Sequence, residues 1–120
     1  MTLRYYVLHT GGVIKMSVEN GILSIDSKRE GGKLTVILKG EINIATSKEF
    51  DEYMDANLAD VSELIFDIRD VEYISSAGLR VFLNSQRIMN NQGSMEILGM
   101  SEEIKDTFDM IGFSKVMRIE

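Results

Sequence analysis

Two adjacent hydroxyl residues, Ser75 and Ser76, lie where an apolar run gives way to a helical pattern. The run Leu64–Ile68 comes shortly before them, and apolar residues recur at helical spacing from Leu79 onward. A serine at the start of a helix caps it, because its hydroxyl accepts a hydrogen bond from a free backbone N–H. The same free N–H groups and the positive end of the helix dipole attract phosphate. The pair therefore indicates a helix cap, a phosphate acceptor, or both.

The residues before this junction predict a hairpin and then a helix. Apolar and polar residues alternate over 23–27, and a stronger strand follows at Lys33–Lys39. Gly40–Thr46 is expected to leave the sheet, and Thr46–Glu49 has the pattern of a capping box that starts an amphipathic helix. The apolar side of this helix is expected to contain Phe50, Tyr53, Met54, Asn57 and Leu58.

The residues from Leu64 onward continue the alternation of strands and helices. Because Leu64–Ile68 is apolar apart from Asp67, we expect a central, partly parallel strand that is covered on both faces. A helix is predicted from about Ser76 to Asn90, and a strand over 95–98. The remaining predictions are a helix capped by Ser101 and stopped by Gly112, and a last strand or tail over 115–119.

The order β-β-α-β-α-β-α-(β) predicts an α/β fold. We expect a single domain over residues 16–120, with a mixed β-sheet of four to five strands packed with helices. Residues 1–15 are interpreted as an N-terminal extension that adds a strand or is loosely held.

Composition excludes several classes of protein. The chain has 120 residues, no cysteine and a net charge of −6, so disulfide scaffolds and cysteine-based metal sites are excluded and nucleic-acid binding is disfavoured. No apolar run approaches the ~18–20 residues that span a membrane. The N-terminus lacks a signal-peptide pattern. We therefore expect a cytoplasmic protein without membrane or nucleic-acid contact. Because the sequence has no heptad pattern, we also expect a monomer.

The sequence also lacks the patterns of common catalytic sites. His9 is the only histidine, so a Ser-His-acid triad has no candidate base near the serines, and no Gly-rich phosphate loop is present. Asp67 and Asp70 flank the end of the predicted central strand, where α/β folds often bind ligands, but we interpret them as solvated loop carboxylates. We predict no catalytic residue, no cofactor and no metal site. A ligand binder or hydrolase would need a pocket lined by Asp67, Asn43 and Ser76.

Four segments, in matching order and spacing, resemble the STAS-domain anti-sigma factor antagonist family. Gly40–Thr46 resembles the family's Gly-Glu-(Leu/Ile)-Asp-x-x-Thr segment, and Ser75–Leu79 resembles its Asp-Ser-(Ser/Ala/Thr)-Gly-Leu core. Leu64–Asp67 followed by Val71–Ile74 resembles the strand that enters the phosphorylation loop, and Thr107–Val116 resembles the closing helix and turn.

The resemblance implies a phosphorylation switch. In this family the serine after the Asp is phosphorylated by a partner that is both anti-sigma factor and serine kinase. The matching residue is Ser76, with Ser75 as second choice because it replaces the Asp, and a separate phosphatase would reset the switch. Asn43 stands where the family often has Asp. The expected partner-binding residues are Asn43, Thr46, Ser75, Ser76, Ala77, Gly78 and Arg80.

Purely structural roles remain open for the same residues. Either serine is a suitable plain helix cap, Gly78 would allow the first helical turn to pack closely on the sheet, and Asn43 and Thr46 would shape a turn and a cap. The alternative function is a STAS scaffold in a stress-signalling or transport complex without sigma factor control.

Overall fold

The structure is a computed structural model, and it describes residues 4–10, 13–19, 22–110, 112 and 118–119. Its elements are, in chain order, β1 Arg4–Thr10, β2 Val13–Glu19, β3 Leu23–Glu30, β4 Lys33–Ile42, α1 Ile44–Asn57, β5 Glu63–Ile74, α2 Ser76–Asn90, β6 Ser94–Leu98, α3 Glu102–Met110 and β7 Arg118–Ile119. The predicted α/β class is confirmed, as are the β3–β4 hairpin and the bounds of α2.

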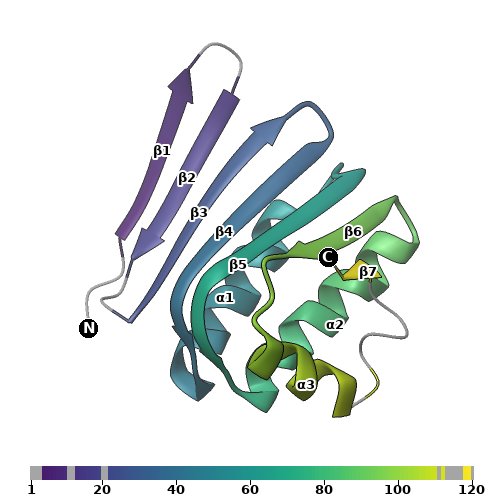
Figure 1. The fold of residues 1–120 in the computed structure, drawn as a ribbon. Coiled ribbons are helices and arrows are strands. Elements are labelled where there is room, and N and C mark those ends of the chain that lie inside the picture. Colours follow the sequence, from purple (N-terminus) through teal and green to yellow (C-terminus); the bar gives the residue numbers. More distant parts are fainter. Residues whose placement is uncertain (1–3, 11–12, 20–21, 111, 113–117, 120) are drawn as a thin grey trace.

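The strands form one mixed sheet in the order of the sequence, β1 to β7 (Figure 1). Neighbours from β1 to β4 are antiparallel, and neighbours from β4 to β7 are parallel. With seven strands the sheet is wider than the four to five predicted, because β1 and β2 extend the edge beyond β3. The boundary expected between residues 15 and 16 falls within β2.

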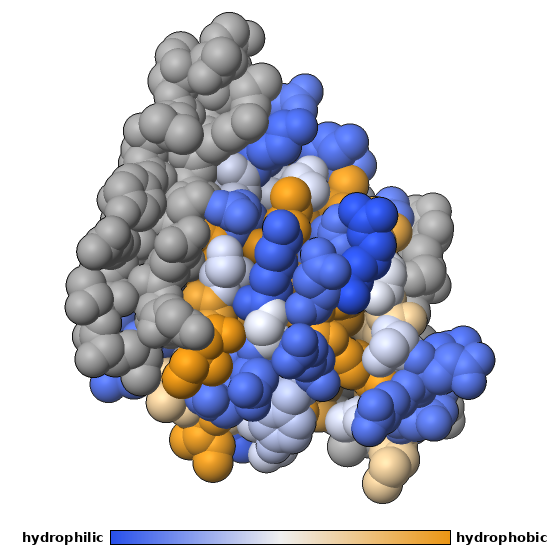
Figure 2. All heavy atoms as spheres, turned by 60° about the vertical axis from the view of Figure 1, so that its left-hand side comes forward, coloured by the Kyte–Doolittle hydropathy of each residue, from blue (hydrophilic) through white to orange (hydrophobic). Residues whose placement is uncertain are grey.

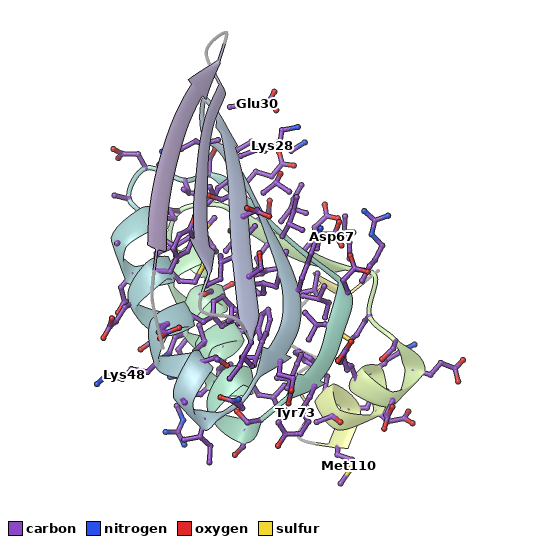
Figure 3. All side chains as sticks on the ribbon, turned by 90° about the vertical axis from the view of Figure 1, so that its left-hand side faces the viewer. Lys28, Glu30, Lys48, Asp67, Tyr73 and Met110 are labelled. Atoms are coloured by element: carbon purple, nitrogen blue, oxygen red, sulfur yellow. The ribbon has the colours of Figure 1, made fainter. Side chains whose placement is uncertain are left out.

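Helices α1 and α2 cover one face of the sheet, and the opposite face is open. Figure 3 views the sheet from its edge and shows Lys28 and Asp67 on the open face, with α1 and α2 on the opposite side of the sheet. Both helices lie on one face because β4-α1-β5 and β5-α2-β6 are crossovers that advance the same way across the sheet, and crossovers keep one hand. Polar and apolar residues are interleaved on the side shown in Figure 2.

The expectation that Leu64–Ile68 is covered on both faces is wrong. Leu64, Phe66 and Ile68 are fully buried on the helix side, whereas Ile65 and Asp67 are only half-buried on the open side. The strand does lie centrally, between β4 and β6, and is parallel to both. It continues to Ile74, so Asp67 lies within β5 rather than beyond its end.

The core joins the sheet to all three helices through an aromatic cluster. Phe50 of α1, Phe66 of β5, Phe82 of α2 and Phe108 of α3 are completely buried. Their rings meet edge to face, a favourable arrangement for aromatic pairs. The predicted apolar side of α1 is confirmed for Phe50, Tyr53, Met54 and Leu58, whereas Asn57 is half-buried.

The C-terminal predictions are confirmed as far as the described residues extend. Ser101 caps α3, since its Oγ accepts a hydrogen bond from the N–H of Ile104 at 3.2 Å. The helix ends at Met110, and Ile111 together with residues 113–117 lies outside the described part of the chain. A last strand is present at Arg118–Ile119, parallel to β6.

Candidate functional site

The N-termini of α1 and α2 lie side by side at the carboxyl ends of β4 and β5. Ile42 and Ile74 are partners in the parallel register of these strands, and each helix starts two residues later. The N–H of Ser75 donates to the carbonyl of Ile42 at 2.8 Å, which joins the two connections. This pairing brings the segment around Asn43 next to the two serines.

Ser75 is the N-cap of α2. Its Oγ accepts a hydrogen bond from the N–H of Gly78 at 3.1 Å, and the residue is only 6% exposed. The hydroxyl is therefore used in holding the helix end, which is the capping role expected of a serine at this junction.

Ser76 is the first residue of α2 and is exposed. Within the described part of the chain its hydroxyl has no hydrogen-bond partner. It stands where the backbone N–H groups of the first turn are not all paired within the helix, so a negative charge on its Oγ would meet the favourable end of the helix dipole.

Asn43 and Thr46 form the capping box of α1. The Oδ1 of Asn43 accepts from the N–H of Thr46 and the Oγ1 of Thr46 accepts from the N–H of Asn43, both at 2.8 Å. The predicted capping box at Thr46–Glu49 is wrong, because the helix already starts at Ile44. Thr46 is completely buried, and its Oγ1 also donates to the carbonyl of Glu41 at 2.8 Å.

We expect Thr46→Val to lower the free energy of unfolding by about 1–3 kcal/mol, because an isosteric side chain would leave the N–H of Asn43 and the carbonyl of Glu41 without their partner. Urea denaturation followed by circular dichroism measures this change. Thr107→Val is the matched control, since the Oγ1 of Thr107 donates only to a carbonyl of its own helix at a half-buried site. An equal loss in both variants would contradict the role of the capping box.

Gly78 allows α2 to approach the sheet closely. A Cβ at this position would lie 2.6 Å from Cγ2 of Ile42 and 3.1 Å from Cγ2 of Ile74. Gly40 has a related role in β4, where it adopts a φ of +105° at a register shift and a Cβ would collide with the carbonyl of Ile22. Gly40–Ile42 thus stays in the sheet, and the expectation that the chain leaves it at Gly40 is wrong.

A groove of about 180 Å³ runs between α1 and α2 and contains part of the predicted site. Ala77 and Arg80 line it from α2, and Lys48 and Asp51 line it from α1. Burial, followed by the neighbouring carboxylates of Asp55 and Glu52, raises the pKa of Asp51. The sequence did not single out Lys48, because it lies far from Arg80 along the chain and only the packing of α1 against α2 brings the two together.

Two exposed apolar residues near the serines also escaped the sequence analysis. Ile44 is 80% exposed at the start of α1, and Tyr73 is 51% exposed near the end of β5 (Figure 3). Once α1 is known to begin at Ile44, this residue is about 120° around the helix from Phe50, away from the buried stripe. If the start of α1 had been predicted at Ile44, the sequence would have placed this residue outside the buried stripe of the helix.

The structure does not bring Asp67 to Asn43 and Ser76. Asp67 pairs with Arg69 on the open face of the sheet, where Nη2 of Arg69 lies 2.6 Å from Oδ2. The hydrogen bond from the Arg69 side chain is the main reason that the pKa of Asp67 is lowered. Ser76 follows the end of β5, roughly 20 Å further along the strand direction. The pocket required for a hydrolase or ligand binder is therefore not formed by these three residues.

The described residues contain no group of three or more His, Cys, Asp or Glu side chains placed to hold a metal ion. None of the described helices combines the length and apolar character needed to cross a bilayer.

Comparison with known proteins places the chain in a family. The family model for the STAS domain matches residues 24–120, from β3 to the C-terminus, and the chain therefore belongs to the STAS domain family. Residues 1–23, which include β1 and β2, precede the matched region.

Several relatives of known name are anti-sigma factor antagonists. The anti-sigma-B factor antagonist of Bacillus subtilis is 26% identical over 98 residues, which cover 81% of this chain and 90% of the relative. The corresponding protein of Listeria monocytogenes is 25% identical over 101 residues, covering 82% of this chain and 89% of the relative. Over most of its length, the chain is therefore similar to proteins named as anti-sigma factor antagonists.

Solved structures show the same fold. An anti-sigma factor antagonist from Mycobacterium paratuberculosis superposes with a TM-score of 0.74 at 18% identity, covering 81% of this chain and 84% of that one. The Bacillus cell fate determinant SpoIIAA in its phosphorylated form gives a TM-score of 0.65 at 15% identity, covering 80% of this chain and 90% of that one.

Proposed function

We propose that this protein is an anti-sigma factor antagonist controlled by phosphorylation of Ser76. The unphosphorylated form binds an anti-sigma factor that is also a serine kinase, and this binding frees a sigma factor. Phosphorylation ends the binding, and a separate phosphatase restores it. The protein itself has no catalytic activity in this scheme and acts in the cytoplasm.

The observation that carries this proposal is the different placement of the two serines. Ser75 is buried, and its hydroxyl accepts a hydrogen bond within the helix cap, whereas Ser76 is exposed at the first position of α2. A kinase needs an accessible hydroxyl, so Ser76 is the better acceptor. The cap supplied by Ser75 also keeps the end of α2 folded while Ser76 is modified.

The partner-binding surface that we propose surrounds Ser76. Ile44 and Tyr73 supply exposed apolar area, and Arg80 supplies charge. The other predicted contacts divide by accessibility: Asn43 and Ala77 are half-buried, whereas Thr46, Ser75 and Gly78 are buried and shape the surface from beneath.

Phosphorylation would change this surface without refolding the domain. The phosphate adds about −1.5 to −2 charges at neutral pH. At the start of α2 the fold tolerates this charge, but a partner that covers Ile44 and Tyr73 would have to desolvate it. A coupling of ~1–3 kcal/mol changes affinity by about 5–150-fold, enough for a switch.

The test is site-mapped phosphorylation in vitro. Wild type, Ser75→Ala and Ser76→Ala are incubated with ATP and an anti-sigma factor kinase whose activity on another substrate is established, and intact mass is measured. We expect one added phosphate that disappears only in Ser76→Ala, and folding of each variant is checked by thermal denaturation.

Other results would argue against the proposal. Loss of the phosphate only in Ser75→Ala would move the acceptor to the cap residue. No phosphate on any form, with binding of the kinase also absent, would favour the STAS scaffold without sigma factor control.

A further inference from the structure

The groove between α1 and α2 reaches Ala77, the residue that follows Ser76. Ser76, Arg80 and Asn84 are spaced by four residues along α2, so they form one ridge of the helix. Arg80 and Asn84 line the groove, and Ala77 lines it next to Ser76. A group attached to the Oγ of Ser76 therefore starts one residue from the groove lining, within reach of Arg80 one turn further along the helix.

Two positively charged side chains line the groove, and neither is paired with another residue that the structure describes. Lys48 and Arg80 are exposed, and neither side chain has an ion pair or hydrogen bond to another described residue. The acidic lining residue is Asp51, whose pKa is raised by burial and by other carboxylates rather than lowered by a cation. Helix α2 contains no Asp or Glu, so nothing on its own surface neutralises Arg80.

We propose that Lys48 and Arg80 form a receiving site for the phosphate carried by Ser76. The inference rests on the proposed phosphorylation of Ser76 and concerns what the phosphate does afterwards. A phosphate dianion at the start of α2 accepts hydrogen bonds from Arg80 on its own helix and from Lys48 across the groove. Figure 3 shows Lys48 on the helix-covered side of the molecule, and its side chain lines the groove between α1 and α2.

This contact gives phosphorylation a second effect on the surface. Besides adding negative charge, the phosphate engages the two cations that the unmodified surface presents to a partner. Before phosphorylation, the two cations beside Ser76 are open to an acidic side chain of a partner. After phosphorylation, the phosphate occupies them and makes this part of the groove negative. A partner that uses Lys48 or Arg80 loses those contacts even where it does not touch Ser76 itself.

The test installs phosphoserine at position 76 during protein synthesis, so no kinase is needed. The ³¹P resonance is followed through a pH titration in the otherwise wild-type protein and in Lys48→Gln and Arg80→Gln. Each lost cation is expected to raise the titration midpoint of the phosphate by roughly 0.2–0.7 pH units, because the dianion loses a favourable charge. Arg87→Gln is the matched control, since Arg87 lies in the last turn of the same helix.

One further variant is expected to shift the titration midpoint of the phosphate in the opposite direction. Asp51→Asn removes the negative charge that lines the groove and is expected to lower the midpoint. The helix end acts equally in all variants, so differences between them report the side chains alone. Midpoints in Lys48→Gln and Arg80→Gln that match Arg87→Gln would overturn the site, and a shift in Arg80→Gln alone would overturn the role of Lys48.

The outcome is independent of the proposed partner. A kinase that modifies Ser76, together with unshifted midpoints, would refute the receiving site and leave the switch intact. Shifted midpoints in a protein that no anti-sigma factor kinase modifies would support the receiving site and refute the proposed function.

Discussion

Phe82→Ala is expected to lower the free energy of unfolding by about 3–5 kcal/mol, a large part of the ~5–15 kcal/mol that stabilises a typical domain. Phe82 is completely buried in α2. Its ring centroid lies 5.2 Å from that of Phe50, 4.9 Å from that of Phe66 and 5.7 Å from that of Phe108. These three rings belong to α1, β5 and α3, so truncation leaves a cavity where four elements meet.

Urea denaturation followed by circular dichroism checks this expectation, with Tyr73→Ala as the control. Tyr73 is also a large aromatic residue, but half of it is exposed, and its truncation should cost much less. Similar losses in the two variants would show that Phe82 does not hold α2 in the core. The result bears on function, because the same packing places the start of α2 beside Asn43.

Gly78→Ala is expected to destabilise the domain by about 1–3 kcal/mol, although alanine is the better helix former. The added methyl group would lie 2.6 Å from Cγ2 of Ile42 and 3.1 Å from Cγ2 of Ile74. Both isoleucines are buried in the core, and Cγ2 is a branch close to the backbone that cannot swing away. The first turn of α2 must therefore move away from the sheet, and this movement disturbs the cap at Ser75.

The sign of the effect is the informative part of this experiment. At a free helical site the same substitution would stabilise the protein by up to ~1 kcal/mol through helix propensity. Thermal and urea denaturation of Gly78→Ala are compared with Ser76→Ala, which changes an exposed residue on the same turn. An increase in stability for Gly78→Ala would show that the contact with Ile42 does not constrain the helix.

Much of the secondary structure could be predicted from local patterns. The β3–β4 hairpin follows from alternation and a glycine turn, and α2 follows from its helical spacing after the serines. The N-cap of α1 was predicted at Thr46, three residues after its actual position at Asn43, because Asn43 and Thr46 cap the helix reciprocally. A side-chain amide and a hydroxyl can form a capping box, whereas the usual sequence pattern has Ser or Thr at the N-cap and Glu or Gln at N3.

By itself, the sequence determined the α/β order of elements, the serine pair at the start of α2 and the resemblance of the segments around it to one family. Only the tertiary structure decided which serine is buried, which face of β5 is open and that Lys48 faces the same groove as Arg80. The physical reason is the parallel register of Ile42 with Ile74. That pairing joins residues that are distant along the chain, so it cannot be predicted from the local spacing of residue types.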